Sequence, residues 1–105
     1  MADEAKIVIA RVYPKPGHLQ KVIDVYAGIA PLVYQEQGCE LFALHTDGET
    51  VFVVEKWPAA AGLKGHAEGS AYAQIRAGIS DLAGHAADVR VLDNLPSGEA
   101  KGTIG

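Results

Sequence analysis

Only one cysteine, Cys39, occurs in the 105 residues, which excludes an intramolecular disulfide framework and a cysteine-rich zinc site. No stretch approaches the ~18 consecutive apolar residues that a membrane-spanning helix needs. The sequence has neither a G-x-G-x-x-G motif after a strand nor a P-loop, so no nucleotide-binding site is indicated. The four histidines are widely spaced and form no H-x-x-x-H pair, so the pattern does not indicate a zinc site.

Basic residues are also few, with nine Lys and Arg against thirteen Asp and Glu and a formal net charge of −4. This balance disfavours a nucleic-acid partner, because neutralising phosphates requires clustered basic side chains. The acidic start of the sequence lacks the basic region of a signal peptide. We therefore expect a cytoplasmic protein without a nucleic-acid or membrane partner.

Apolar residues are abundant at 49% of the sequence, which excludes disorder for most of the chain. A chain of this length forms one domain that buries about two-thirds of its surface. From Pro96 onward, small and polar residues dominate. We expect a single domain over residues 1–95 and a flexible carboxy-terminal tail over residues 96–105.

Hydrophobic periodicity and turn residues divide the chain into seven segments. Alternating or continuous apolar residues predict strands over 6–13, 40–46, 50–57 and 88–92. Helical spacing predicts helices over 18–37, 59–67 and 71–82, with a break around Gly69 and Ser70 as the cap of the last helix. Asp47-Gly48-Glu49 predicts a hairpin between the second and third strands.

This order predicts a ferredoxin-like β-α-β-β-α-β fold of the α+β class, with two helices on one face of a four-stranded antiparallel sheet. The strands at 6–13 and 50–57 are apolar on both faces, whereas the helices cover only one. The uncovered apolar face predicts a homodimer that packs sheet to sheet.

Four segments of the sequence, taken together, resemble a known family. They are similar to segments of the antibiotic biosynthesis monooxygenase family, particularly its small quinol-monooxygenase-like members. The segments are Lys15-Pro16-Gly17-His18, Glu36-Gln37-Gly38-Cys39, the strand that ends at Trp57, and Leu63-Lys64-Gly65-His66. The resemblance covers roughly residues 6–95. It implies a dimeric α+β barrel that oxidises a small phenolic or quinol substrate with O₂, without flavin, haem or metal.

The sequence departs from two branches of this family. Val53 and Leu63 stand where members that act on anthrone-type substrates carry asparagine and tyrosine. In the haem-degrading branch, the positions of the functional asparagine, tryptophan and histidine ligand correspond to Arg11, His66 and Arg76 here. These differences disfavour both anthrone oxidation and haem degradation as the activity of this chain.

Two candidate site residues lie on the strand at 50–57. Glu55 and Trp57 are two residues apart and therefore project from the same face. Trp57 matches the family's tryptophan and is a candidate wall for an aromatic substrate, with core packing as the alternative. Glu55 is a candidate base, with an ion pair to Arg11 or Arg76 as the alternative.

His66 is the first candidate for proton transfer, because it matches a histidine frequent in the family and an imidazole exchanges protons near neutral pH. The alternative is a half-exposed histidine in a structural hydrogen bond. Arg76 and Arg11 are candidates for binding an anionic substrate group, and Tyr72 is a candidate for substrate contact or for core packing.

Two other functions are compatible with the same residues. Proteins of this fold can isomerise or cleave small carbonyl or phosphorylated compounds, for which Arg11 and Arg76 would supply the cations. A non-catalytic dimer could bind a metabolite in the same cavity. Oxygen uptake with hydroquinones would separate the monooxygenase from both.

Overall fold

The computed structural model describes residues 4–104, which contain four strands and three helices. Their bounds in chain order are β1 Lys6–Val12, α1 Leu19–Tyr34, β2 Leu41–Thr46, β3 Val51–Trp57, α2 Ala60–Glu68, α3 Ser70–Ile79 and β4 Asp88–Asp93, followed by a short 3-10 turn at Ala100–Gly102. The first three residues, on which the expected absence of a signal peptide partly rests, and residue 105 lie outside the described part.

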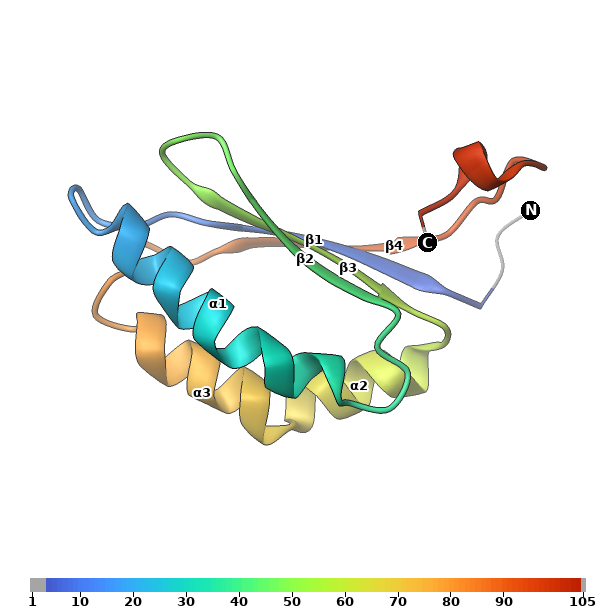
Figure 1. The fold of residues 1–105 in the computed structure, drawn as a ribbon, viewed down its shortest axis with the longest axis horizontal. Helices are drawn as coiled ribbons and strands as arrows, with labels where there is room; N and C mark the ends of the chain where they lie inside the picture. Colours follow the sequence, from blue (N-terminus) through green and yellow to red (C-terminus); the bar gives the residue numbers. More distant parts are fainter. Residues whose placement is uncertain (1–3, 105) are drawn as a thin grey trace.

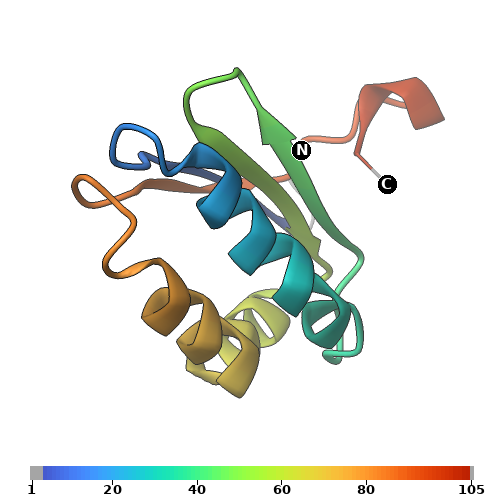
Figure 2. The same ribbon diagram turned by 60° about the vertical axis from the view of Figure 1, so that its left-hand side comes forward.

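The sheet is antiparallel throughout, with the strand order β2-β3-β1-β4. All three helices lie on one side of it, as the two views in Figure 1 and Figure 2 show. The connections from β1 to β2 and from β3 to β4 each pass through the helical layer. This arrangement confirms the predicted ferredoxin-like α+β fold.

The pairing register determines which side chains face the helices. On β3 burial alternates along the strand, and the helix-facing members Val51, Val53, Glu55 and Trp57 are all buried. Their partners Val8, Ala10 and Val12 on β1 face the same way. Helix α1 packs against this layer with Val22, Tyr26, Ala30 and Val33, whose spacing places them on one face.

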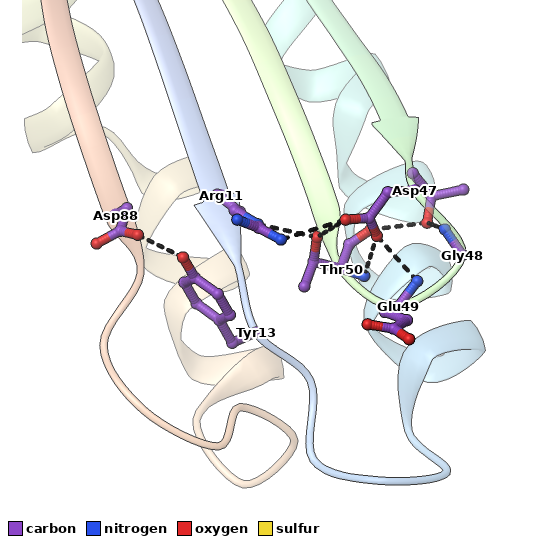
Figure 3. A network of polar contacts seen from close by, with 8 residues as sticks. Arg11, Tyr13, Asp47, Gly48, Glu49, Thr50 and Asp88 are labelled. Carbon is purple, nitrogen blue, oxygen red and sulfur yellow. Dashed lines mark hydrogen bonds and ion pairs between the residues drawn. The ribbon is translucent and has the colours of Figure 1, made fainter.

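The β2–β3 hairpin is closed by Asp47, as predicted from the turn residues. Asp47 Oδ1 accepts hydrogen bonds from the backbone N–H groups of Glu49 and Thr50, at 2.9 and 2.6 Å (Figure 3). These bonds lower the pKa of the Asp47 carboxyl to about 2, because they stabilise its charged form. Gly48 takes a positive φ of 92° in the turn, which a residue with a side chain rarely adopts.

The segment between β3 and β4 forms two helices, as predicted. Helix α2 ends at Glu68, and the backbone is extended at Gly69 before α3 begins. A Cβ on Gly69 would lie 3.0 Å from Glu36 Oε2 and 3.1 Å from the Gly65 carbonyl oxygen, so this close turn favours glycine. The expected cap was misplaced by one residue, since Gly69 is the N-cap and Ser70 is the first residue of α3, with no side-chain cap bond.

Other helix boundaries also differ from the prediction. Helix α1 spans Leu19–Tyr34 rather than 18–37, and α3 ends at Ile79 rather than at 82. Pro31 lies inside α1, which continues for three residues beyond it. Within residues 4–104, no helix is both long and apolar enough to cross a membrane.

Substituting Gly78, where α3 approaches α1, tests how tightly these helices pack. A Cβ there would lie 2.7 Å from Val25 Cγ1, and β-branched valine has little rotamer freedom in a helix. We expect Gly78→Ala to destabilise the protein by about 1–3 kcal/mol, as overpacking does, despite the better helix propensity of alanine. Urea unfolding measures the change.

Gly28→Ala is the matched control, because Gly28 lies in α1 with nothing within 4 Å of the added Cβ. This variant should gain about 0.5–1 kcal/mol from helix propensity alone. Equal stabilisation of both variants would show that the α1–α3 contact tolerates a methyl group.

Candidate active site

A cavity of about 800 Å³ lies among side chains of the sheet and the three helices. Its sheet side is formed by all four strands, and most of its lining is apolar, including Val8, Ala10, Val53, Ile75, Val89 and Val91. The polar side chains at the cavity include Tyr26, Glu55, His66, Tyr72, Arg76 and His85. Volume and lining are typical of a small-molecule site.

His66, on α2, is held in a cage of aromatic rings and is only 5% exposed. Its ring stacks on Trp57, with centroids 4.8 Å apart and planes at 28°. Tyr72 contacts it edge-on at 5.5 Å, and Phe42 lies at 5.8 Å. The ring is therefore fixed in orientation and buried, rather than half-exposed as the alternative interpretation expected.

Glu36 follows the last residues of α1. Its Oε1 lies 2.6 Å from His66 Nδ1. Glu36 falls within the predicted helix over 18–37 and was not among the predicted site residues. Thirty residues separate it from His66, and no local pattern joins the two. Only its place in the Glu36-Gln37-Gly38-Cys39 segment, quoted for the family resemblance, gave a signal.

Glu55 lies on the other side of His66, with its Oε1 3.8 Å from His66 Nε2. The same oxygen accepts a hydrogen bond of 3.0 Å from Trp57 Nε1–H. Burial raises the pKa of Glu55 above its ordinary value, although the Trp57 hydrogen bond and nearby His66 act in the opposite direction. The expected ion pair with Arg11 or Arg76 is replaced by these two contacts.

Replacing Glu55 should change how stability depends on pH. Because its pKa is raised in the folded state, the unfolded chain loses this proton first as pH rises, and stability falls between the two pKa values. Glu55→Gln cannot ionise, yet its amide oxygen can still accept the Trp57 hydrogen bond. We expect this variant to gain stability relative to the wild type as pH rises from 4 to about 7.5.

Urea unfolding of both proteins at each pH, at one protein concentration, measures this difference. A stability difference that stays constant over the range would show that Glu55 ionises in the folded state as readily as in the unfolded chain.

Trp57 shares the face of Glu55, as expected, but His66 covers it. Its side chain is fully buried and is absent from the cavity lining. Any influence of Trp57 on a ligand would therefore act through His66 and Glu55. Tyr72 and Arg76, both on α3, do line the cavity, with the guanidinium carbon of Arg76 5.9 Å from the Tyr72 ring centroid.

Arg11 requires a correction, because the structure places it on the opposite face of the sheet. It pairs in register with Phe52, whereas its neighbours Ala10 and Val12 face the helices. Its guanidinium contacts Asp47 at 3.3 Å and Thr50 Oγ1 at 3.1 Å (Figure 3). The sheet thus separates Arg11 from the cavity.

Two further cavity residues were not among the predicted site residues. Tyr26 is buried but reaches the cavity from α1, and burial raises its pKa to about 12. His85 lines the cavity and packs against Tyr13, with ring centroids 4.2 Å apart. Within residues 4–104, no cluster of three or more His, Cys, Asp or Glu side chains is arranged to hold a metal ion.

Known proteins share both this sequence pattern and this fold. The sequence model of the family described as antibiotic biosynthesis monooxygenase matches residues 6–78. The probable quinol monooxygenase YgiN of Escherichia coli K12 is 32% identical over 72 residues, which span 56% of this chain and 69% of YgiN.

Solved structures agree. Rv0793 from Mycobacterium tuberculosis has a TM-score of 0.79 at 26% identity, covering 91% of this chain and 98% of its own. PA3566 from Pseudomonas aeruginosa has a TM-score of 0.79 at 20% identity, covering 90% and 98%, and supports the fold alone. Since the matched residues 6–78 extend from β1 into α3 and include Glu36, Glu55 and His66, the chain belongs to the antibiotic biosynthesis monooxygenase family.

Proposed function

We propose that the protein is a cofactor-independent monooxygenase that oxidises a small aromatic or quinol substrate with O₂. The observation that carries this proposal is the apolar cavity whose wall holds a buried histidine between two glutamates. Family membership and the similarity to a probable quinol monooxygenase support the reaction class. A cytoplasmic location remains a prediction.

The proposed reaction converts a hydroquinone and O₂ into a hydroxyquinone and water. One oxygen atom enters a ring C–H position, the other becomes water, and the substrate supplies all four electrons. Removing a phenolic proton first makes the ring electron-rich enough to reduce O₂. The protein therefore needs a base near the substrate hydroxyl and a cavity of low polarity.

The residues around the cavity fit these needs. In the proposed reaction, His66 Nε2 accepts the phenolic proton, and the same imidazole returns a proton to the hydroxide that leaves as water. Glu55, whose pKa burial raises, is the second proton carrier. Tyr72 and Arg76 line the cavity, and their proposed roles are to contact the ring and to balance negative charge on the substrate oxygens.

Oxygen consumption with a panel of substituted hydroquinones tests the proposal. We expect uptake above the autoxidation rate, with one O₂ consumed per hydroquinone, no accumulation of hydrogen peroxide, and label from ¹⁸O₂ in the quinone product. Saturable binding of hydroquinones without oxygen uptake would contradict the monooxygenase and favour a binding protein. Turnover of carbonyl or phosphorylated compounds would favour an isomerase or lyase.

We also propose that the functional unit is a homodimer packed sheet to sheet. The face opposite the helices carries apolar side chains on the two central strands, where Ile9 pairs with Val54 and is 37% exposed. On the outer strands, Leu92 of β4 is 42% exposed on the same face. A second copy would remove this apolar surface from water.

A further inference from the structure

The two ring nitrogens of His66 face two carboxylates that lie at different distances. On one side, Nδ1 is 2.6 Å from Glu36, which is a short hydrogen bond. On the other, Nε2 is 3.8 Å from Glu55, which is too long for a hydrogen bond. His66 is therefore bound on the Glu36 side and unbonded on the cavity side.

The surroundings of the two glutamates also differ. The Glu36 side chain is 20% exposed and lines a second cavity of about 470 Å³, beside Gly62 and Gly65. The Glu55 side chain is 9% exposed and faces the main cavity. Burial raises the pKa of Glu55, and two carboxyls in such different surroundings can take separate roles in acid–base chemistry.

We propose that Glu36 is the positioning residue of this site: its carboxylate keeps the proton of neutral His66 on Nδ1 and leaves the Nε2 lone pair free toward the main cavity. A carboxylate only accepts hydrogen bonds, so the 2.6 Å contact requires the proton on Nδ1. When Nε2 takes a proton from a ligand, the charge of Glu36 stabilises the imidazolium that forms. Only this last step rests on the proposed function, since the tautomer is a property of the free protein.

The packing around His66 keeps this assignment from reversing. Stacking on Trp57 and edge contact with Tyr72 oppose a ring flip that would exchange the two nitrogens. Other titratable groups near the site include Tyr26, with its pKa raised to about 12, Cys39, whose pKa burial raises, and Tyr72, Arg76 and His85 at the cavity. Both Tyr26 and Cys39 are therefore neutral at pH 7, and neither competes with Glu36 for the Nδ1 proton.

Nitrogen NMR of ¹⁵N-histidine-labelled protein tests the tautomer without any substrate. His66 signals are assigned by their absence in His66→Gln. We expect wild-type neutral His66 to show Nδ1–H and a bare Nε2, which is the minor tautomer of histidine in water. In Glu36→Gln, the new amide can donate a hydrogen bond to Nδ1 as well as accept one from it. We therefore expect a mixture of the two His66 tautomers or the Nε2–H tautomer alone.

Glu68→Gln is the matched control for the loss of a carboxylate. Glu68 lies on α2 with His66, but its side chain is 62% exposed and pairs with Lys64. It should leave the His66 tautomer unchanged. An Nε2–H tautomer in the wild type would overturn the proposal even if Glu36→Gln failed to fold. A Glu36→Gln spectrum identical to that of the wild type would overturn it as well.

Turnover provides a second readout once a hydroquinone substrate is established. Glu36→Gln should lower kcat about 10²-fold or more with little change in KM, because Glu36 does not line the main cavity. An unchanged kcat would overturn the role of Glu36 in positioning. If the wild type consumes no oxygen but shows the Nδ1–H tautomer, the monooxygenase proposal fails while the Glu36–His66 assignment stands.

Discussion

With a competent hydroquinone, His66→Ala should lower kcat by about 10²–10⁴-fold at neutral pH, the usual contribution of general acid–base catalysis. The variant has no group at the position of Nε2, so the substrate loses its proposed proton acceptor. The loss should shrink as pH rises, because the hydroquinone then ionises without the enzyme. Oxygen uptake measured from pH 6 to about 9 reports this recovery.

Two further variants separate proton transfer from packing. His66→Gln retains a polar side chain that can contact Glu36 but cannot carry a proton, so it should lose as much activity as His66→Ala. His18→Ala removes a histidine near the start of α1, outside the cavity lining, and should keep wild-type activity. An equal loss at every pH would assign His66 a structural role and make Glu55 the next candidate base.

The second large effect is expected at the uncovered face of the sheet. Ile9→Glu should convert the proposed dimer to a monomer at micromolar concentration. Burying an ion costs several kcal/mol, and the two-fold symmetry of a dimer places two new carboxylates in one interface. Size-exclusion chromatography with light scattering should give the mass of two chains for the wild type and of one chain for the variant.

Ala27→Glu is the control for the added charge, because Ala27 is exposed on α1, on the helical side of the sheet. It should remain dimeric. A wild-type protein that elutes as a stable monomer at micromolar concentration would refute the sheet-to-sheet dimer.

Most of the fold was predictable because its signals are local. The run Asp47-Gly48-Glu49 lies between two apolar stretches, and the structure places the β2–β3 hairpin there with Asp47 bonded to its own turn. The boundaries of the strands differ from the prediction by one residue at most. The helix ends were less accurate, since α1 stops at Tyr34 although polar residues continue the helical pattern to Gln37.

The candidate site was only partly predictable. Glu55 and Trp57 were assigned to one face because a strand alternates, and that face does point to the helices. His66 was chosen by its chemistry and its resemblance to a family position, and the structure places it against Glu55. Its burial between aromatic rings came from packing among β2, β3, α2 and α3, which no single segment encodes.

By itself, the sequence determined the order of strands and helices, the antiparallel hairpin and the presence of one apolar core, since each follows from side-chain periodicity along a few neighbouring residues. The tertiary structure alone decided which face of β1 meets the helices. Both faces of that strand are apolar, so the position of Arg11 relative to the cavity depended on pairing with β3 and β4. The same holds for Glu36 and His66, thirty residues apart, because a hydrogen bond between distant segments forms only where the packing of whole helices brings them together.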